Sequence, residues 1–151
     1  MKTGSIEFMI AIILGILFLF CAKDSRADEE SVWLTTGEWS RHNEQDKHHY
    51  RQNNTGVGIQ YDVNSDASAL VGYYENSIHR STFYMGMTYT PWHFGNAKIG
   101  VMGAMATGYT EVIPAIPIAS LYGTYEHGRF GANFYWLPTV VVAVQLKVRG
   151  W

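Results

Sequence analysis

The chain has 151 residues, a formal net charge of −2 and a composition that is 47% hydrophobic, 15% aromatic and 16% charged. So high an apolar and aromatic content excludes an intrinsically disordered chain. Because there is no basic excess, we expect no nucleic-acid partner. The length leaves room for one domain.

The N-terminal segment is typical of an export signal. Lys2 precedes the uncharged run 8–20, and the small residues Ser25 and Ala27 flank Arg26 as in a signal-peptidase site. The run is shorter than the roughly 18 residues with which a helix spans a bilayer, so a retained anchor is the less favoured alternative. We therefore expect a cleaved signal peptide at 1–27 and a single domain at 28–151.

Beyond residue 28 the apolar residues alternate with period two, the pattern of half-buried strands. In 80–90, for example, Phe83, Met85 and Met87 share one face, and Tyr84 and Gly86 share the other. Clusters of Gly, Asn, Asp, Ser and Pro separate such stretches and indicate turns. The sequence predicts eight strands, at 31–42, 54–63, 67–77, 80–91, 97–108, 113–125, 128–137 and 140–150.

Eight strands of about ten residues match the smallest transmembrane barrels, whose closure pairs every backbone donor and acceptor. Aromatic residues near the predicted strand ends are typical of interfacial girdles. The fold class predicted is therefore an all-β, eight-stranded antiparallel transmembrane barrel of the outer-membrane type. We expect a monomer in the outer membrane that depends on the barrel-assembly machinery. A soluble lipocalin-like barrel is the alternative.

An even strand count places both termini on one side of the membrane. The outward connections are then expected at 43–54, at 76–80, and as short turns around 109–111 and 138–139. Inward-facing residues near this outer end are small or apolar, whereas those near the other end include Asp62, Arg129, Lys147 and Arg149. The pattern predicts a charged network around Asp62 below and an apolar void above, which suits a hydrocarbon chain. Alternatively, the glycines only relieve crowding.

Polar groups converge on the outer end in this topology: His42 ends the first strand, Asn76 and Ser77 end the third, and Arg80 begins the fourth. A Ser hydroxyl near an imidazole is the minimum for acyl transfer or hydrolysis. The neighbouring pair His48-His49 lies in a polar loop with no strand to fix it, so we expect no metal and no other cofactor.

Five stretches resemble one known family: 39–42 (Trp-Ser-Arg-His), the Asp46-Lys47 pair, 56–58 (Gly-Val-Gly), the Asn76-Ser77 pair, and the proline-spaced stretch 113–120. They are similar to the lipid A palmitoyltransferases of the outer membrane, the PagP type. That family is an eight-stranded barrel with an acyl pocket in its outer half. It moves a palmitoyl chain from a phospholipid to lipid A with an outward-facing His and an Asp-Ser pair.

The resemblance implies roles for particular residues. His42 and Ser77 would be catalytic, together with Asn76, which stands where the family has Asp. The substrate-binding residues would be Arg80 for the headgroup, Tyr84, Gly86 and Ala143 for the acyl slot, and Pro114, Pro117 and Pro138 for lateral openings. The family His directly follows a Trp, whereas Ser40 and Arg41 separate Trp39 from His42 here.

Phospholipid donor and lipid A acceptor are thus the expected partners. The alternatives are a non-catalytic barrel with a structural or surface-masking role and a lipid A deacylase, whose His-x-Ser-Asn pattern is absent.

Overall fold

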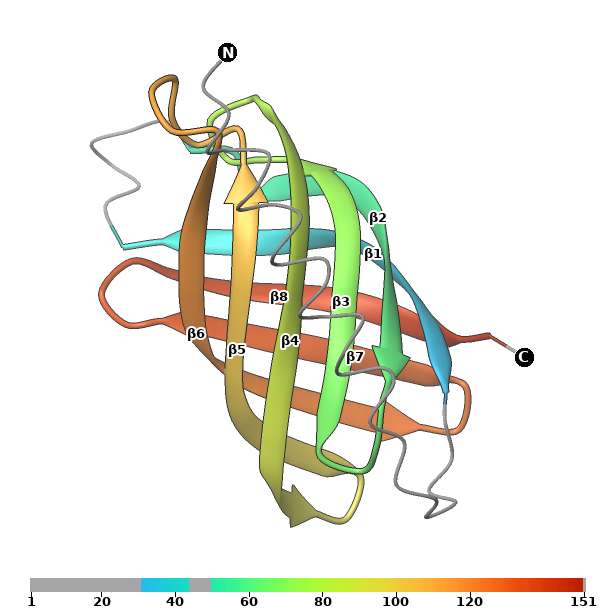
Figure 1. The fold of residues 1–151 in the computed structure, drawn as a ribbon. Helices are drawn as coiled ribbons and strands as arrows, with labels where there is room; N and C mark the ends of the chain where they lie inside the picture. Colours follow the sequence, from blue (N-terminus) through green and yellow to red (C-terminus); the bar gives the residue numbers. More distant parts are fainter. Residues whose placement is uncertain (1–30, 44–49, 151) are drawn as a thin grey trace, which may run out of the picture.

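In the computed structural model, residues 31–43 and 50–150 are described. They form the strands β1 (Val32–His42), β2 (Asn53–Asp62), β3 (Ala67–Glu75), β4 (Ser81–Phe94), β5 (Ala97–Thr107), β6 (Ala115–His127), β7 (Phe130–Leu137) and β8 (Val141–Arg149). Each strand pairs antiparallel with the next, and β8 pairs with β1, so the sheet closes (Figure 1). The predicted eight-stranded antiparallel barrel is confirmed.

The predicted signal peptide at 1–27 and the pairs Asp46-Lys47 and His48-His49 lie outside the described residues. Within the described part of the chain, no helix is long and apolar enough to cross a membrane.

The predicted strands agree with the observed ones to within three residues, and two of the differences concern the candidate site. β3 ends at Glu75, so Asn76 and Ser77 lie in the turn that follows and not at a strand end. β6 begins at Ala115, which makes the β5–β6 connection, 108–114, longer than the predicted short turn. The Thr110 hydroxyl bonds the backbone of Ile113 in both directions and closes a local turn there.

The two ends of the barrel differ. The chain enters β1 and leaves β8 at the same end of the barrel, where the turns β2–β3, β4–β5 and β6–β7 also lie. The other end carries the connections β1–β2, β3–β4, β5–β6 and β7–β8, and we call the adjoining half of the barrel the loop-side half. This arrangement agrees with the predicted placement of the termini.

The outer surface of the barrel is apolar and its interior is largely polar. Outward-facing residues such as Leu34, Ile59, Phe83 and Leu146 are each about half exposed or more. The buried side chains include many Thr, Asn, Gln and Ser residues. This inverted polarity is that of a barrel surrounded by lipid, and it argues against the lipocalin-like alternative.

Hydrogen-bonded side chains fill the half of the barrel opposite the loops. Gln60 Nε2 donates to Asp62 Oδ1 at 2.9 Å, and Asn133 Nδ2 donates to Gln60 Oε1 at 3.0 Å. Lys147, whose side chain is fully buried, bonds Glu126 Oε1 at 2.5 Å. We call these five residues, with Gln145, the plug network. Because side chains fill the interior of an eight-stranded barrel, we expect no continuous channel through it.

The sequence predicts a charged network around Asp62, but basic residues do not supply the hydrogen bonds of this carboxylate. Asp62 accepts its hydrogen bonds from Ser31, Trp33, Gln60 and Ser68, and not from basic residues. Neutral donors next to Asp62 are close enough to satisfy its carboxylate. The basic residue of the network is Lys147, which pairs with Glu126 on β6.

Candidate functional site

A β-bulge in β1 determines which side chains of this strand face the interior. The register shifts between Thr36 and Glu38 in the pairing with β2, and between Thr35 and Glu38 in the pairing with β8. A Cβ on Gly37 would lie 2.0 Å from the backbone oxygen of Asn54, so this position requires glycine. The bulge adds one residue to the strand. Before the bulge, the odd-numbered residues Trp33 and Thr35 face the interior. After it, the even-numbered residues do, beginning with Glu38.

The loop-side half of the barrel contains a cavity of about 100 Å³. Two of the predicted acyl-slot residues, Tyr84 and Ala143, are in its wall. The rest of the wall is mainly aliphatic and aromatic, and comprises Leu70, Tyr74, Met102, Ala104, Ala106, Tyr109, Ile118, Tyr135, Leu137 and Val141, with Glu38 and Gln145. The cavity therefore lies where the sequence predicts an apolar void.

Gly86, the third predicted slot residue, is not part of this wall. A Cβ at this position would lie 2.5 Å from the backbone oxygen of Gly103 and 2.6 Å from the Cβ of Ala104. The glycine thus permits close packing of β4 against β5, as the crowding alternative supposes. Any larger residue there would disturb the β4–β5 pair before it shortened the cavity.

A few polar groups interrupt the apolar wall. Glu38 Oε1 accepts a hydrogen bond from Asn54 Nδ2 at 3.3 Å, and the hydroxyls of Tyr74 and Tyr109 bond each other at 2.5 Å. Burial raises the pKa of Tyr109 to about 12, and the charge of Glu38 acts in the same direction against the lowering effect of the Tyr74 hydrogen bond. The Tyr109 phenol is therefore neutral at physiological pH.

The pairing between β6 and β7 is incomplete beside this cavity. Its register begins at Leu121↔Trp136, so the first residues of β6, 115–120, have no partner in β7. Ile118 in this stretch and Leu137 at the end of β7 both line the cavity. We call this place the β6–β7 seam.

The three predicted gate prolines lie near the seam in sequence. Pro117 is in the part of β6 that has no partner in β7, Pro114 is in the connection that precedes β6, and Pro138 is in the turn after β7. Proline has no backbone N–H to donate, so Pro117 and Pro138 cannot contribute ladder hydrogen bonds where β6 and β7 part.

Asn76 uses its whole side chain to build the β3–β4 turn. It is fully buried, and its Oδ1 accepts hydrogen bonds from the backbone N–H groups of Ile78 and Arg80 at 3.1 and 2.9 Å. Its Nδ2 donates to Thr82 Oγ1 at 3.0 Å and to the Gly108 carbonyl at 3.3 Å. The amide therefore joins this turn to the β5–β6 connection, which an aspartate could not do.

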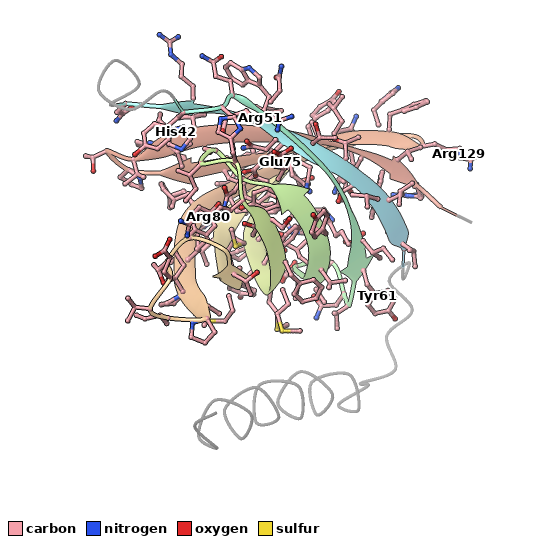
Figure 2. All side chains as sticks on the ribbon, turned by 90° about the horizontal axis from the view of Figure 1, so that it is seen from above. His42, Arg51, Tyr61, Glu75, Arg80 and Arg129 are labelled. Carbon is pink, nitrogen blue, oxygen red and sulfur yellow. The ribbon has the colours of Figure 1, made fainter. Side chains whose placement is uncertain are left out.

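The remaining rim residues lie at the same end of the barrel. Figure 2 shows His42, Arg51 and Arg80 toward this end and Arg129 toward the other. The backbone N–H of Arg51 donates to the carbonyl of Ser77 at 2.9 Å, which links the β1–β2 connection to the β3–β4 turn.

The His42 imidazole stacks on Tyr50 with ring centroids 4.3 Å apart, and its buried Nδ1 has no hydrogen-bond partner. Ser77 is buried, and within the described part of the chain it forms no hydrogen bond with His42. Arg80 Nη2 bonds Glu111 Oε1 at 2.7 Å, and both side chains are exposed. The structure thus brings these residues to one rim without joining them in a hydrogen-bonded triad.

Glu38 is the chief cavity residue that sequence reasoning missed. Strict alternation from Trp33 would place it on the outer face, and only the bulge turns it inward. The isolated Gly37 within a strand was the available signal, since such a glycine often marks a bulge. Among residues 31–43 and 50–150, no three His, Cys, Asp or Glu side chains gather where they could hold a metal ion.

The comparisons with known proteins support the fold. Two solved structures of transmembrane β-barrels are similar. One is titled "De novo design of transmembrane beta-barrels" (15% identity, TM-score 0.56, 83% of this chain and 98% of that one), and the other is the NMR structure of the designed protein TMB2.3 (12% identity, TM-score 0.53, 83% and 99%). No protein-family model and no curated protein matches the chain. The protein is therefore a small transmembrane β-barrel with a cavity at its loop-side end.

Proposed function

We propose that the protein is an acyltransferase of the outer membrane that moves a fatty acyl chain from a phospholipid to lipid A. The observation that carries this proposal is the apolar cavity in the loop-side half of a lipid-surrounded barrel. Such a cavity accepts hydrocarbon, whereas the plug network below it offers only polar groups.

The β6–β7 seam supplies a route from the bilayer to this cavity. Ile118 and Leu137 are in the cavity wall, and the backbone of β6 beside Ile118 has no β7 partner. An acyl chain entering here would cross no complete ladder of backbone hydrogen bonds. The cavity, at about 100 Å³, is smaller than the roughly 300 Å³ at which ligand sites begin, so we expect it to hold the end of a chain.

In this proposal the reaction takes place at the rim, at the outward end of the cavity. The ester bond of the phospholipid breaks, an ester to a hydroxyl of lipid A forms, and the proton of that hydroxyl passes to the leaving lysophospholipid. His42 would accept and return the proton through its imidazole. Ser77 would orient the reacting groups, and Arg80, held at its backbone by Asn76, would bind the phosphate of the headgroup.

Mass spectrometry of lipid A tests the proposal. The wild-type chain and Ser77→Ala would be expressed in Gram-negative cells, with insertion checked by heat-modifiable gel mobility. We expect one additional acyl chain on lipid A with wild type and none with Ser77→Ala. The matched control is Ser81→Ala, because Ser81 lies at the same end but its exposed hydroxyl bonds Tyr73 on the outer face. Loss of a chain with wild type would indicate a deacylase instead.

A non-catalytic barrel is the second candidate, and the side chain of Asn76 favours it. Both polar atoms of its side chain are occupied by partners in the turn, in β4 and in the β5–β6 connection, which leaves none for a substrate. This candidate predicts unchanged lipid A with both wild type and Ser77→Ala, although each barrel inserts normally.

A further inference from the structure

The wall of the cavity contains one carboxylate and no basic residue. Glu38 is the only Asp or Glu in the wall, and none of the described residues that line it is Lys, Arg or His. The one hydrogen bond that Glu38 accepts, from Asn54 at 3.3 Å, is long. A carboxylate in an apolar site is costly unless a cation or several donors compensate it. A cation entering the cavity would supply this compensation to the ionised carboxyl.

A second acceptor beside Glu38 is also without a partner. Asn54 is 2% exposed, and its Nδ2 donates to Glu38 and Ser40, but its buried Oδ1 accepts nothing. Buried acceptors are normally satisfied by a protein donor or by an ordered group. Two acceptors at this place, Glu38 and Asn54 Oδ1, are thus poorly satisfied, and a ligand that brings hydrogen-bond donors or a positive charge suits them.

Aromatic rings complete this environment. Tyr74, Tyr84, Tyr109 and Tyr135 all line the cavity. The rings of Tyr74 and Tyr84 are tilted by 55° with centroids 5.6 Å apart, so they present differently oriented faces. Ring faces attract organic cations, and sites that surround a substituted ammonium with aromatic rings use this attraction.

We propose that the cavity binds the ammonium group of an amphiphile, with Glu38 as its counter-ion and the tyrosine rings around it. A volume of about 100 Å³ is two-thirds of the roughly 150 Å³ that accommodates benzene, and suits a small substituted ammonium. The alkyl chain leaves past Ile118 and Leu137 at the β6–β7 seam. This inference goes beyond the proposed acyl transfer and uses none of the rim residues, but it concerns the same cavity, so an ammonium group and the end of an acyl chain would occupy it in turn and not together.

Binding of hexyltrimethylammonium to the full chain, folded in vesicles of an uncharged glycolipid, tests the inference. The matched probes are hexanol and hexyl sulfate, which have the same chain without the cation. Calorimetry should show tighter binding of the ammonium compound than of either of the others. Glu38→Gln keeps the shape and an acceptor for Asn54, and should weaken binding about ten-fold or more. The control Glu75→Gln removes a rim carboxylate that pairs with Arg51, and should leave binding within about two-fold.

Two results would overturn the inference: Glu38→Gln binding as tightly as wild type, or hexanol binding as tightly as the ammonium probe. If Glu38→Gln fails to insert, Ala143→Leu decides, because a side chain that fills the cavity must abolish binding. Repeating the titration in phosphatidylethanolamine vesicles identifies the source of the ammonium. Weaker apparent binding there assigns the site to a lipid headgroup, and equal binding assigns it to a free amphiphile. Lipid A mass spectra are a separate measurement, so failure of the acyltransferase proposal would leave this result standing.

Discussion

Replacing Asn76 with Asp distinguishes a structural from a catalytic role of this side chain. The resemblance to palmitoyltransferases implies that Asp restores a missing acid. The structure implies that it removes the donations of Nδ2 to Thr82 Oγ1 and to the Gly108 carbonyl. At about 0.5–1.5 kcal/mol each, two lost hydrogen bonds lower the free energy of unfolding by about 1–3 kcal/mol. Asn76→Ala loses the two accepted bonds as well, so its loss should reach about 2–6 kcal/mol.

Urea unfolding in lipid vesicles, followed by tryptophan fluorescence, measures these differences. We expect the midpoints to fall in the order wild type, Asn76→Asp, Asn76→Ala. Asn64→Asp is the matched control, because the Asn64 side chain in the β2–β3 turn only accepts hydrogen bonds, at Oδ1 from Asp66 and Ala67. Its stability should change by less than about 0.5 kcal/mol. An Asn76→Asp barrel as stable as wild type, with increased lipid modification, would refute the structural explanation.

Three other substitutions test the barrel interior by the same unfolding assay. Lys147→Ala should lower the free energy of unfolding by about 3–5 kcal/mol because it leaves the Glu126 carboxylate buried without its nearest cation. Adding Glu126→Gln should recover most of this stability. A double variant as unstable as the single one would contradict the explanation. Trp33→Phe should cost about 1.5–3 kcal/mol by removing the indole N–H that donates to Asp62 at 2.8 Å, and an unchanged midpoint would show that water replaces the donor. Gly37→Ala should cost about 1–3 kcal/mol or prevent insertion, because its Cβ would lie 2.0 Å from a backbone oxygen; normal stability would mean that the bulge can move.

The fold could be predicted because lipid surrounds the barrel and so imposes alternation on nearly every strand. The predicted strand bounds differ most from the observed ones where a bulge breaks the alternation. β4 continues to Phe94, three residues beyond the prediction, since its register with β5 shifts between Tyr89 and Trp92. A period-two pattern ends at such a shift although the pairing resumes.

The candidate site was less predictable because it depends on register and on hydrogen bonds. Tyr84 and Ala143 follow from alternation alone, and both lie in the cavity wall. Glu38 does not, because one inserted residue reverses the face on which it lies. The sequence identifies Asn76 as a polar residue in a hairpin, but it does not show the four bonds that occupy its amide, one of which, to the Gly108 carbonyl, requires the β5–β6 connection to be in place.

The floor of the cavity follows from the division of the barrel into two halves. Tyr135 and Gln145 line the cavity, and the Tyr135 hydroxyl donates to Gln145 Oε1 at 2.9 Å. Gln145 Nε2 donates in turn to the Thr36 carbonyl at 3.0 Å, beside the bulge that turns Glu38 inward. A ligand that entered from the loop side would therefore meet a floor fixed by hydrogen bonds. Because the floor and the bulge share Gln145, the depth of the cavity and the position of its carboxylate are set by the same interactions.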